Sequence, residues 1–409
     1  MRPEFHFTAN GWINDPHAIT FARGRCHLFF QHVPGVTEWN PACSWGHASG
    51  NDLFSLRQLP PALSPGDGDA GVWSGSLMTD AEGNTRILYT SVAGHDPAIG
   101  RIRSATPADE DWVTWVKGPV VASAPLSDQR VLMYRDPMIV QDGDHWRMLV
   151  GAGLADGVAA VVGYSSSDGV EWNEDGIVLA RPASEQHPVW TGSMWECPQI
   201  VEVNGRHALI ISVWDSNVLY DVVYALGDYA DGVFSPQSWA RLSYGPSPYA
   251  ATVFRDAEDR PCLMFWLRDV SGDGWAGAHS IPYRITITDE VLALEPHPDL
   301  TQYYGPAQPG GIASDITWPT RADDVVKIIR DGAVVLKLER DSQDLVVTLT
   351  DASYRVPWAG SIRVVVDGPV LEISSAAGTF ASPIHPFGSE WDIEGAGVSA
   401  RRLETQALA

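Results

Sequence analysis

The chain has 409 residues, with 27 Lys or Arg against 51 Asp or Glu, so its formal net charge at pH 7 is −24. This acidic balance argues against nucleic acid and against an anionic membrane surface as partners, because both are bound by clustered Lys and Arg. A hydrophobic content of 44% excludes a disordered chain, and the combination of 17 Trp, 38 Gly and 29 Pro favours an all-β protein that binds a neutral ligand with flat apolar faces, such as a sugar.

The N-terminal sequence MRPEFHFTANGWINDPH contains no apolar core of a signal peptide, and no window approaches the roughly 18 apolar residues of a membrane span. The four cysteines lie far apart without a CxxC pair, which argues against a zinc site and a disulfide framework. We therefore expect a cytoplasmic protein with reduced thiols, as a monomer or homodimer. A secreted chain that has lost its signal peptide would look the same.

A repeated outline runs along the first 300 residues. Short apolar strands such as CHLFF, RILYTSV, WRMLVGAG, HALIISVW and PCLMFWL each follow a turn signal. The units are anchored, at steps of 59, 62, 60 and 53 residues, at Asp15, Ser74, Asp136, Glu196 and Tyr249. This period is typical of propeller blades, so we predict five four-stranded blades over residues 1–305. A β-sandwich with fortuitous spacing is the alternative.

The pattern changes after Pro309-Gly310-Gly311. Segments such as VVKIIRDGAVVLKLER and IRVVVDGPVLEIS alternate without the blade outline. They predict a separate antiparallel β-sandwich over residues 315–409, in which we find no candidate for chemistry.

Three acidic residues, Asp15, Asp136 and Glu196, are expected to stand at the same place in their units, with a proline directly after the two aspartates and after Cys197 in the third. Innermost strands of a propeller converge on one axis, so the three side chains should point into one funnel. When carboxyl groups share a pocket, their mutual repulsion raises the pKa of at least one of them. Acid-assisted glycosidic cleavage requires such a protonated carboxyl group. A single Asp-Pro pair is more often a turn, which is what we expect of Asp96-Pro97.

Aromatic and polar side chains accompany these acids. Indole faces stack on sugar rings, while amides and hydroxyls bind sugar hydroxyls. The candidates are Trp12, Asn14, Gln31, Trp39, Trp45, Ser74 and Trp195. Most of the other Trp residues are expected to serve packing. We expect Trp39, Trp45 and the loop of Asp67-Gly68-Asp69 to form a rim that narrows the entrance.

Histidines are frequent near the N-terminus. No HxH or HExxH spacing is present, so we expect hydrogen-bonding roles, and neither a metal nor a cofactor, for His6, His17, His32 and His47. Gly-rich segments such as SGDGWAG lack the phosphate-loop pattern and are expected to be turns.

These motifs resemble those of glycoside hydrolase family 32, the invertase and fructanase family. The family motif W-x-N-D-P-N-G is similar to WINDPHA (12–18), R-D-P to YRDP (134–137) and E-C-P to WECP (195–198). Further similarity lies in HLFFQHVP, SWGHA, WSGS, YALGDY and YGPSPYAATVF, so the resemblance covers about 250 residues. The family fold is a five-bladed propeller followed by a β-sandwich, which agrees with the repeat.

The resemblance implies roles for individual residues. Asp15 would be the nucleophile, Glu196 the general acid/base and Asp136 the stabiliser that holds fructose hydroxyls. The sugar contacts would be Trp12, Asn14, Gln31, Trp39, Ser74 and Arg135. His17 and Ala18 replace the family's Asn and Gly, which leaves the chemistry in place and puts substrate preference in doubt.

The implied reaction is retaining hydrolysis of a terminal β-D-fructofuranoside. Glu196, kept protonated by its acidic neighbours, would donate a proton to the leaving oxygen, and Asp15 would form a fructosyl-enzyme. A narrow axial funnel predicts exo-action on sucrose and short oligosaccharides. Fructosyl transfer and a non-catalytic sugar-binding propeller are alternatives. A related propeller family cleaves arabinan or xylan by inversion, but the motif contexts favour fructosides.

Overall fold

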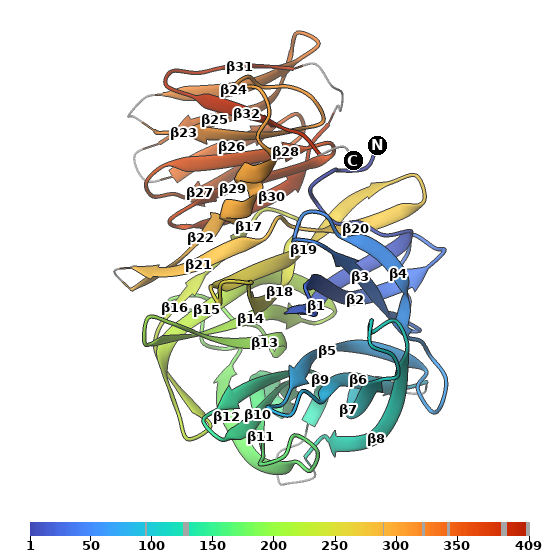
Figure 1. Ribbon diagram of the computed structural model, residues 1–409. Coiled ribbons are helices and arrows are strands. Elements are labelled where there is room, and N and C mark those ends of the chain that lie inside the picture. The colour runs from blue at the N-terminus through green and yellow to red at the C-terminus, as the bar shows by residue number, and fades with distance from the viewer. Residues whose placement is uncertain are drawn as a thin grey trace.

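The computed structural model describes residues 1–94, 96–125, 131–288, 290–320, 324–341, 344–385 and 391–405. Five antiparallel blades surround one axis, and two further sheets form a sandwich on one side of this ring (Figure 1). This arrangement confirms the predicted five-bladed propeller with a C-terminal β-sandwich. Asp96 begins a strand, so the turn expected at Asp96-Pro97 is wrong.

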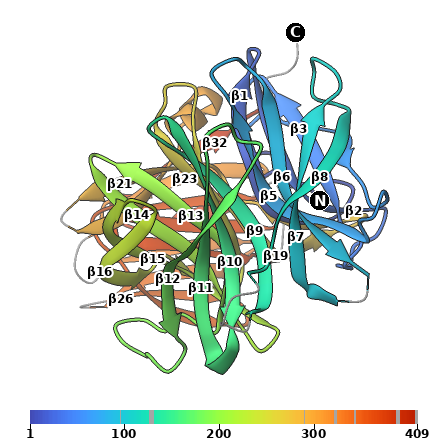
Figure 2. The ribbon, with the colours of Figure 1, turned by 90° about the horizontal axis from the view of Figure 1, so that it is seen from below.

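The blades contain four strands each, in the order innermost to outermost. Blade 1 consists of β1 (Gly11–Ala22), β2 (Arg25–Pro34), β3 (Ser44–Gly50) and β4 (Arg57–Leu63). Blade 2 consists of β5 (Gly71–Thr79), β6 (Thr85–Ala93), β7 (Asp96–Pro107) and β8 (Trp115–Ser123). Blade 3, whose strands run side by side in Figure 2, consists of β9 (Val131–Asp142), β10 (His145–Leu154), β11 (Val158–Ser166) and β12 (Asn173–Pro182).

Blade 4 consists of β13 (Met194–Val203), β14 (Arg206–Asp215), β15 (Val218–Ala230) and β16 (Val233–Arg241). Blade 5 has a divided third strand and consists of β18 (Pro248–Arg255), β19 (Pro261–Gly272), β20 (Trp275–His279), β21 (Tyr283–Thr288) and β22 (Val291–Pro296). Two short 3-10 helices, Ala155–Gly157 and Pro298–Tyr303, complete this part, and neither of these described helices has the length or apolar character to cross a membrane.

The ring closes through its innermost strands. Each of β1, β5, β9 and β13 contacts the next innermost strand in chain order, and β18 contacts β1. A parallel pairing of β20 with β1 fastens blade 5 to blade 1, with Trp275 opposite Gly11. The second strand of blade 1, β2, is buried on both faces between its two exposed ends, although it carries His27, Gln31 and His32 among its apolar residues. Five segments distant in sequence therefore meet at one axis.

Each innermost strand that carries a predicted acid is bulged beside it. The strand pairing shifts register between Ile13 and Pro16 around Asp15, between Arg135 and Met138 around Asp136, and between Glu196 and Gln199. A second shift in β1 follows His17. Within these bulges Asp136 has φ 65° and Ala18 has φ 50°. A bulge bends the strand and redirects a side chain, which here turns polar groups toward the axis instead of into a neighbouring blade.

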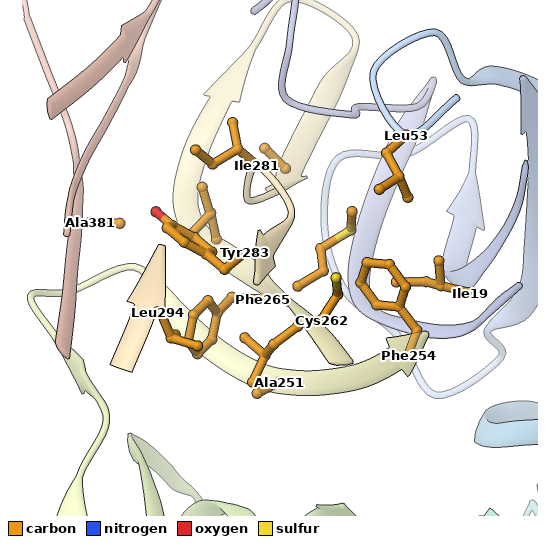
Figure 3. Close-up of a cluster of buried hydrophobic side chains, with 14 of the residues drawn as sticks. Ile19, Leu53, Ala251, Phe254, Cys262, Phe265, Ile281, Tyr283, Leu294 and Ala381 are labelled. Carbon is orange, nitrogen blue, oxygen red and sulfur yellow. The ribbon is translucent and has the colours of Figure 1, made fainter. Parts of the chain in front are cut away.

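The largest hydrophobic cluster joins blades 1 and 5 to the sandwich. Phe254 of blade 5 lies beside Ile19 of blade 1, Phe265 of the same blade lies beside Leu294, and Ala381 contributes from the sandwich (Figure 3). Burial of such side chains contributes roughly 1.5–3 kcal/mol each to folding. The closing blades and the sandwich thus share one core.

The sandwich consists of two antiparallel sheets. One contains β23 (Ala313–Trp318), β28 (Ile362–Asp367), β29 (Val370–Ser375), β30 (Gly378–Pro383) and β32 (Ser399–Leu403), and it is extended by β17 (Ser243–Tyr244) from the propeller. The other contains β24 (Val325–Arg330), β25 (Ala333–Arg340), β26 (Asp344–Leu349), β27 (Ser353–Pro357) and β31 (Asp392–Glu394). The predicted boundary between residues 305 and 315 stays a prediction.

A buried ionic cluster connects the N-terminal segment to the sandwich. Nδ1 of His6 lies 2.8 Å from Asp367 Oδ2, and Nε2 lies 2.7 Å from Glu372 Oε1. Glu372 also accepts a hydrogen bond from the Tyr283 hydroxyl of blade 5 at 2.7 Å. Burial alone would lower the pKa of His6, but the two carboxylates outweigh it and raise the pKa to about 9.

Ala18 occupies a left-handed conformation that favours glycine. We predict that Ala18→Gly raises the free energy of unfolding by about 1 kcal/mol, because Gly removes the Cβ strain at positive φ. Ala22→Gly on the same strand, outside the left-handed region, is the control and should lower it by about 0.5–1 kcal/mol. Denaturant unfolding of both variants checks this, and destabilisation by both would contradict it.

The raised pKa of His6 predicts a loss of stability in alkaline solution. The contribution of a His with a raised pKa is complete below its unfolded pKa of about 6.5 and is lost as pH rises through the folded value of about 9. This linkage amounts to about 3 kcal/mol. Unfolding curves between pH 6 and about 9.5 should show a decline that His6→Gln removes.

His32 provides the matched control, because it is also buried but burial lowers its pKa. His32→Gln should leave the alkaline decline in place. An unchanged decline in His6→Gln would contradict the assignment.

Candidate active site

The structure brings Asp15, Asp136 and Glu196 together at the axis. They lie on β1, β9 and β13, the innermost strands of blades 1, 3 and 4. The thiol of Cys197 joins two of them, with Sγ 3.6 Å from Asp15 Oδ2 and 3.7 Å from Asp136 Oδ2. The predicted convergence of the three acids is therefore present in the geometry.

Asp15 is held by uncharged donors. Ser74 Oγ donates to Asp15 Oδ2 at 2.6 Å, and Asn14 Nδ2 donates to Oδ1 at 3.0 Å. Gln31 Nε2 donates to Ser74 Oγ at 2.6 Å and thereby fixes the direction of the serine hydroxyl. Burial raises the pKa of Asp15 and the charge of Glu196 adds to this, while the bond from Ser74 opposes it. The result is a fixed, poorly solvated carboxylate.

Asp136 is fixed by the backbone around it. Its own amide donates to Thr90 Oγ1 at 2.8 Å, and its Oδ2 accepts from the amide of Cys197 at 3.1 Å. Burial raises the pKa of Asp136 to about 7, with Arg135 opposing the shift and the charges of Glu196 and Asp15 reinforcing it. The expectation that at least one pKa rises among the grouped acids thus agrees with this environment.

Glu196 has a different environment, made of strong donors. Nε and Nη2 of Arg135 donate to Oε1 at 2.9 and 2.8 Å, and the Tyr249 hydroxyl donates to Oε2 at 2.6 Å. The Glu196 side chain keeps 16% of its exposure, so it can be reached from solvent. Arg135 was predicted to contact the sugar, and its guanidinium instead donates both of these hydrogen bonds to Glu196.

The two oxygens of Glu196 differ in their ability to carry a proton. Arginine only donates hydrogen bonds, so Oε1 faces two N–H groups and has no acceptor there. The Tyr249 hydroxyl can turn to a second acceptor, the Val213 carbonyl oxygen at 3.2 Å, and can itself accept. Oε2 is therefore the oxygen on which the surroundings accommodate a proton.

The repeat aligns the acids less regularly than the sequence analysis assumes. Asp136 with φ 65° and Cys197 with φ 46° occupy equivalent bulge positions, and each precedes a proline. Glu196 therefore corresponds to Arg135 and not to Asp136. The expectation that the three acids share one position in their units is therefore wrong. Glu196 is displaced by one residue from Asp136, and Asp15 lies in an earlier bulge of β1, between Ile13 and Pro16. The bulges bend the strands and allow these different positions to reach the axis.

The predicted aromatic contacts divide into two groups. Trp12 is half-buried and donates from Nε1 to Asn14 Oδ1 at 3.0 Å, and Trp39 is 48% exposed and packs edge-on against Trp73. Both remain candidates for sugar contact. Trp45 and Trp195 are fully buried, so their expected roles at the rim and beside the acid are wrong. Trp45 packs in the hydrophobic cluster between blades 1 and 2, and Trp195 packs in the cluster between blades 3 and 4.

Other expectations for the entrance also need correction. Asp69 is buried and accepts hydrogen bonds from Tyr89 and Ser91 of blade 2, so it anchors its loop to blade 2 and does not form the entrance rim. His6 and His32 form the predicted hydrogen bonds. His17 does not, because both of its ring nitrogens are buried without a partner and its ring lies 4.1 Å from that of Trp45.

One cluster has the composition of a metal site. Asp256, Cys262 and His297 place potential ligand atoms within 4.8 Å of one another in blade 5. Asp256 Oδ2, however, already accepts from His297 Nε2 and from Arg260. Burial raises the pKa of Cys262 to about 12, whereas metals bind the thiolate. We assign this cluster to structural hydrogen bonding.

Tyr249 and Thr90 are site residues that the sequence motifs did not predict. Tyr249 anchors the fifth repeat unit at the position that Glu196 occupies in the fourth, so the repeat itself contained the signal. Thr90, which also donates to the Ser74 carbonyl, lies within the strand RILYTSV and has no distinguishing motif.

Comparison with known proteins agrees with this geometry. Residues 6–296 match the model of the glycosyl hydrolases family 32 N-terminal domain. The chain is 31% identical over 320 residues to a sucrose-6-phosphate hydrolase of Zymomonas mobilis, an alignment that covers 72% of this chain and 61% of that protein. It is 26% identical over 328 residues to a fructan 6-exohydrolase of Beta vulgaris, covering 70% and 52%. The chain thus spans about three-fifths of the first of these relatives.

Solved structures extend the similarity to the whole fold. A Bombyx mori β-fructofuranosidase superimposes with a TM-score of 0.86 at 22% identity, covering 100% of this chain and 95% of that one. A sucrose-6-phosphate hydrolase of Lactobacillus gasseri gives a TM-score of 0.82 at 21% identity, with coverage of 98% and 93%. With its matching family domain, motifs and fold, the chain belongs to glycoside hydrolase family 32.

Proposed function

We propose that the protein is a retaining, exo-acting β-fructofuranosidase that hydrolyses terminal β-D-fructofuranosides such as sucrose. The observation that carries this proposal is the unequal environment of the two principal acids. Asp15 is fixed by hydrogen bonds from two neutral donors, Ser74 and Asn14, whereas Glu196 has one oxygen beside a hydroxyl that can turn away and admit a proton. Such a difference suits a nucleophile and a general acid.

The reaction follows from these environments. Glu196 donates the proton on Oε2 to the glycosidic oxygen while Asp15 attacks the anomeric carbon, which gives a fructosyl-enzyme. The ionised Glu196, now stabilised by Arg135 and Tyr249, removes a proton from water, and the water oxygen attacks the same carbon to release fructose. Asp136, rigidly held by the Cys197 amide, binds fructose hydroxyls and stabilises the oxocarbenium-like state.

Sucrose 6-phosphate is the second candidate substrate, because relatives from Zymomonas mobilis and Escherichia coli are named sucrose-6-phosphate hydrolases. The net charge of −24 opposes an anionic substrate. The two arginines near Glu196 already have hydrogen-bond partners that a substrate phosphate would have to replace. Arg135 donates to Glu196, and Arg268 donates to two backbone carbonyls. These observations favour the neutral sugar.

The alternative activities, the cellular location and the oligomeric state stay predictions. Fructosyl transfer would use the same three acids with a sugar in place of water, and the non-catalytic propeller is disfavoured because all three acids are present. The cytoplasmic location and the monomeric or homodimeric state stay predictions as well.

We predict that Asp15→Asn abolishes turnover of every fructoside, because no nucleophile remains. Glu196→Gln should lower kcat/KM for sucrose by about 10²–10⁴-fold and affect p-nitrophenyl β-D-fructofuranoside far less, since this activated leaving group needs no proton. Steady-state kinetics with both substrates provide the measurement. Equal losses on the two substrates would contradict the acid role of Glu196.

Product analysis tests the substrate class and the exo mode. With equal concentrations of sucrose and sucrose 6-phosphate, we expect the larger kcat/KM for sucrose. With a fructan of defined length, free fructose and the substrate shortened by one unit should appear first, because the acids are recessed. A preference for the phosphorylated sugar would establish the second candidate, and mid-sized fragments appearing before fructose would refute the closed funnel.

A further inference from the structure

Arg268, on β19 of blade 5, connects three elements beside Glu196. Its Nη1 donates to the Leu219 carbonyl at 2.8 Å, and its Nη2 donates to the Tyr220 carbonyl at 3.0 Å. The guanidinium carbon lies 4.9 Å from the centre of the Tyr249 ring. No motif of the sequence analysis includes this residue, yet it reaches both blade 4 and the tyrosine that binds the proposed acid.

The contacts of Arg268 determine where the Tyr249 ring can lie. A guanidinium over an aromatic face is attracted by the ring quadrupole, and its planar fork holds both carbonyls at once. Leu219 pairs with Trp214 at the start of β15, so the same guanidinium also fixes the end of β14. Nε is buried without a partner, which indicates that the side chain is placed by the other two nitrogens and the ring.

The position of the ring matters because the Tyr249 hydroxyl has two acceptors. It lies 2.6 Å from Glu196 Oε2 and 3.2 Å from the Val213 carbonyl, which belongs to β14. Arg268 thus fixes the ring that carries the hydroxyl and the hairpin that carries the second acceptor. Displacement of either by about 1 Å would disturb proton transfer at Glu196, and such displacements cost up to about 10²-fold in rate.

We propose that Arg268 is a positioning residue for the general acid, acting through Tyr249 on the protonation of Glu196. This inference rests on the proposed function. It requires that Arg268 matters most when the leaving group needs a proton. A purely structural arginine would affect all substrates alike.

The test uses Arg268→Met, which keeps an unbranched side chain and removes the charge and both donors. For sucrose we expect kcat/KM to fall at least about 10-fold, and for p-nitrophenyl β-D-fructofuranoside less than about 3-fold, because only the first requires the proton. Arg268→Lys, which keeps the cation over the ring, should recover part of the loss. In a Tyr249→Phe background, Arg268→Met should add less than about 2-fold on sucrose, because the hydroxyl it positions is gone.

Arg181 offers a matched control elsewhere in the propeller. Its guanidinium lies 5.0 Å from the centre of the Trp239 ring and donates to the carbonyls of Val189 and His187, both at 2.8 Å, without touching an acid of the site. Arg181→Met should therefore leave the ratio of the two kcat/KM values unchanged.

Equal losses on both substrates in Arg268→Met, or full additivity with Tyr249→Phe, would overturn the inference. The Arg268→Lys variant gives the same two readouts should Arg268→Met not fold. A wild-type protein that hydrolyses neither substrate would refute the proposed function instead, so the two failures are distinguishable.

Discussion

Mutual repulsion among Asp15, Asp136 and Glu196 is the constraint around which the site is built. Three carboxyl groups in a poorly solvated funnel cannot all ionise without compensation. The compensation is distributed unequally: Arg135 neutralises Glu196, hydroxyl and amide donors serve Asp15, and one backbone amide serves Asp136. This distribution gives each acid different hydrogen-bond partners, and burial together with the neighbouring carboxylates raises the pKa of Asp136 to about 7.

The architecture provides the rigidity that such a site needs. The bulged innermost strands carry the acids. Each of these strands pairs with a second strand that is buried between adjacent blades, and this packing holds the innermost strand in place. The sandwich contributes at a distance, because His6, Asp367 and Glu372 fasten the N-terminal segment and blade 5 to it, and blade 5 carries Tyr249 and Arg268. A buried charged cluster that forms only when all three parts are docked favours one arrangement of the domains.

The sequence was sufficient to predict the propeller, the sandwich and the three acids, since each depends on a period or motif that local residues display. It was not sufficient for contacts made by bulges. Asp136 directly precedes Pro137 whereas Cys197 separates Glu196 from Pro198, so the offset of one residue is visible in the sequence. The bulges with positive φ at Asp136 and Cys197, which bring both acids to the axis, are not. The burial of individual Trp side chains could not be predicted either. Trp45 and Trp195 resemble binding residues in sequence, but packing between blades removes both from solvent. Arg268 lacks any motif because its role depends on two carbonyls and a ring from other strands.

The proposed mechanism depends most directly on Asp15 as the nucleophile whose carboxylate oxygen forms a covalent bond to fructose. In Glu196→Gln, release of the fructosyl group is slowed because no base activates water, so the intermediate should accumulate with p-nitrophenyl β-D-fructofuranoside. Rapid acid quench, proteolysis and mass spectrometry measure its location. The account predicts that the peptide containing Asp15 gains the mass of one fructosyl residue. A fructosyl group on the peptide of Asp136, or turnover without any labelled peptide, would contradict it.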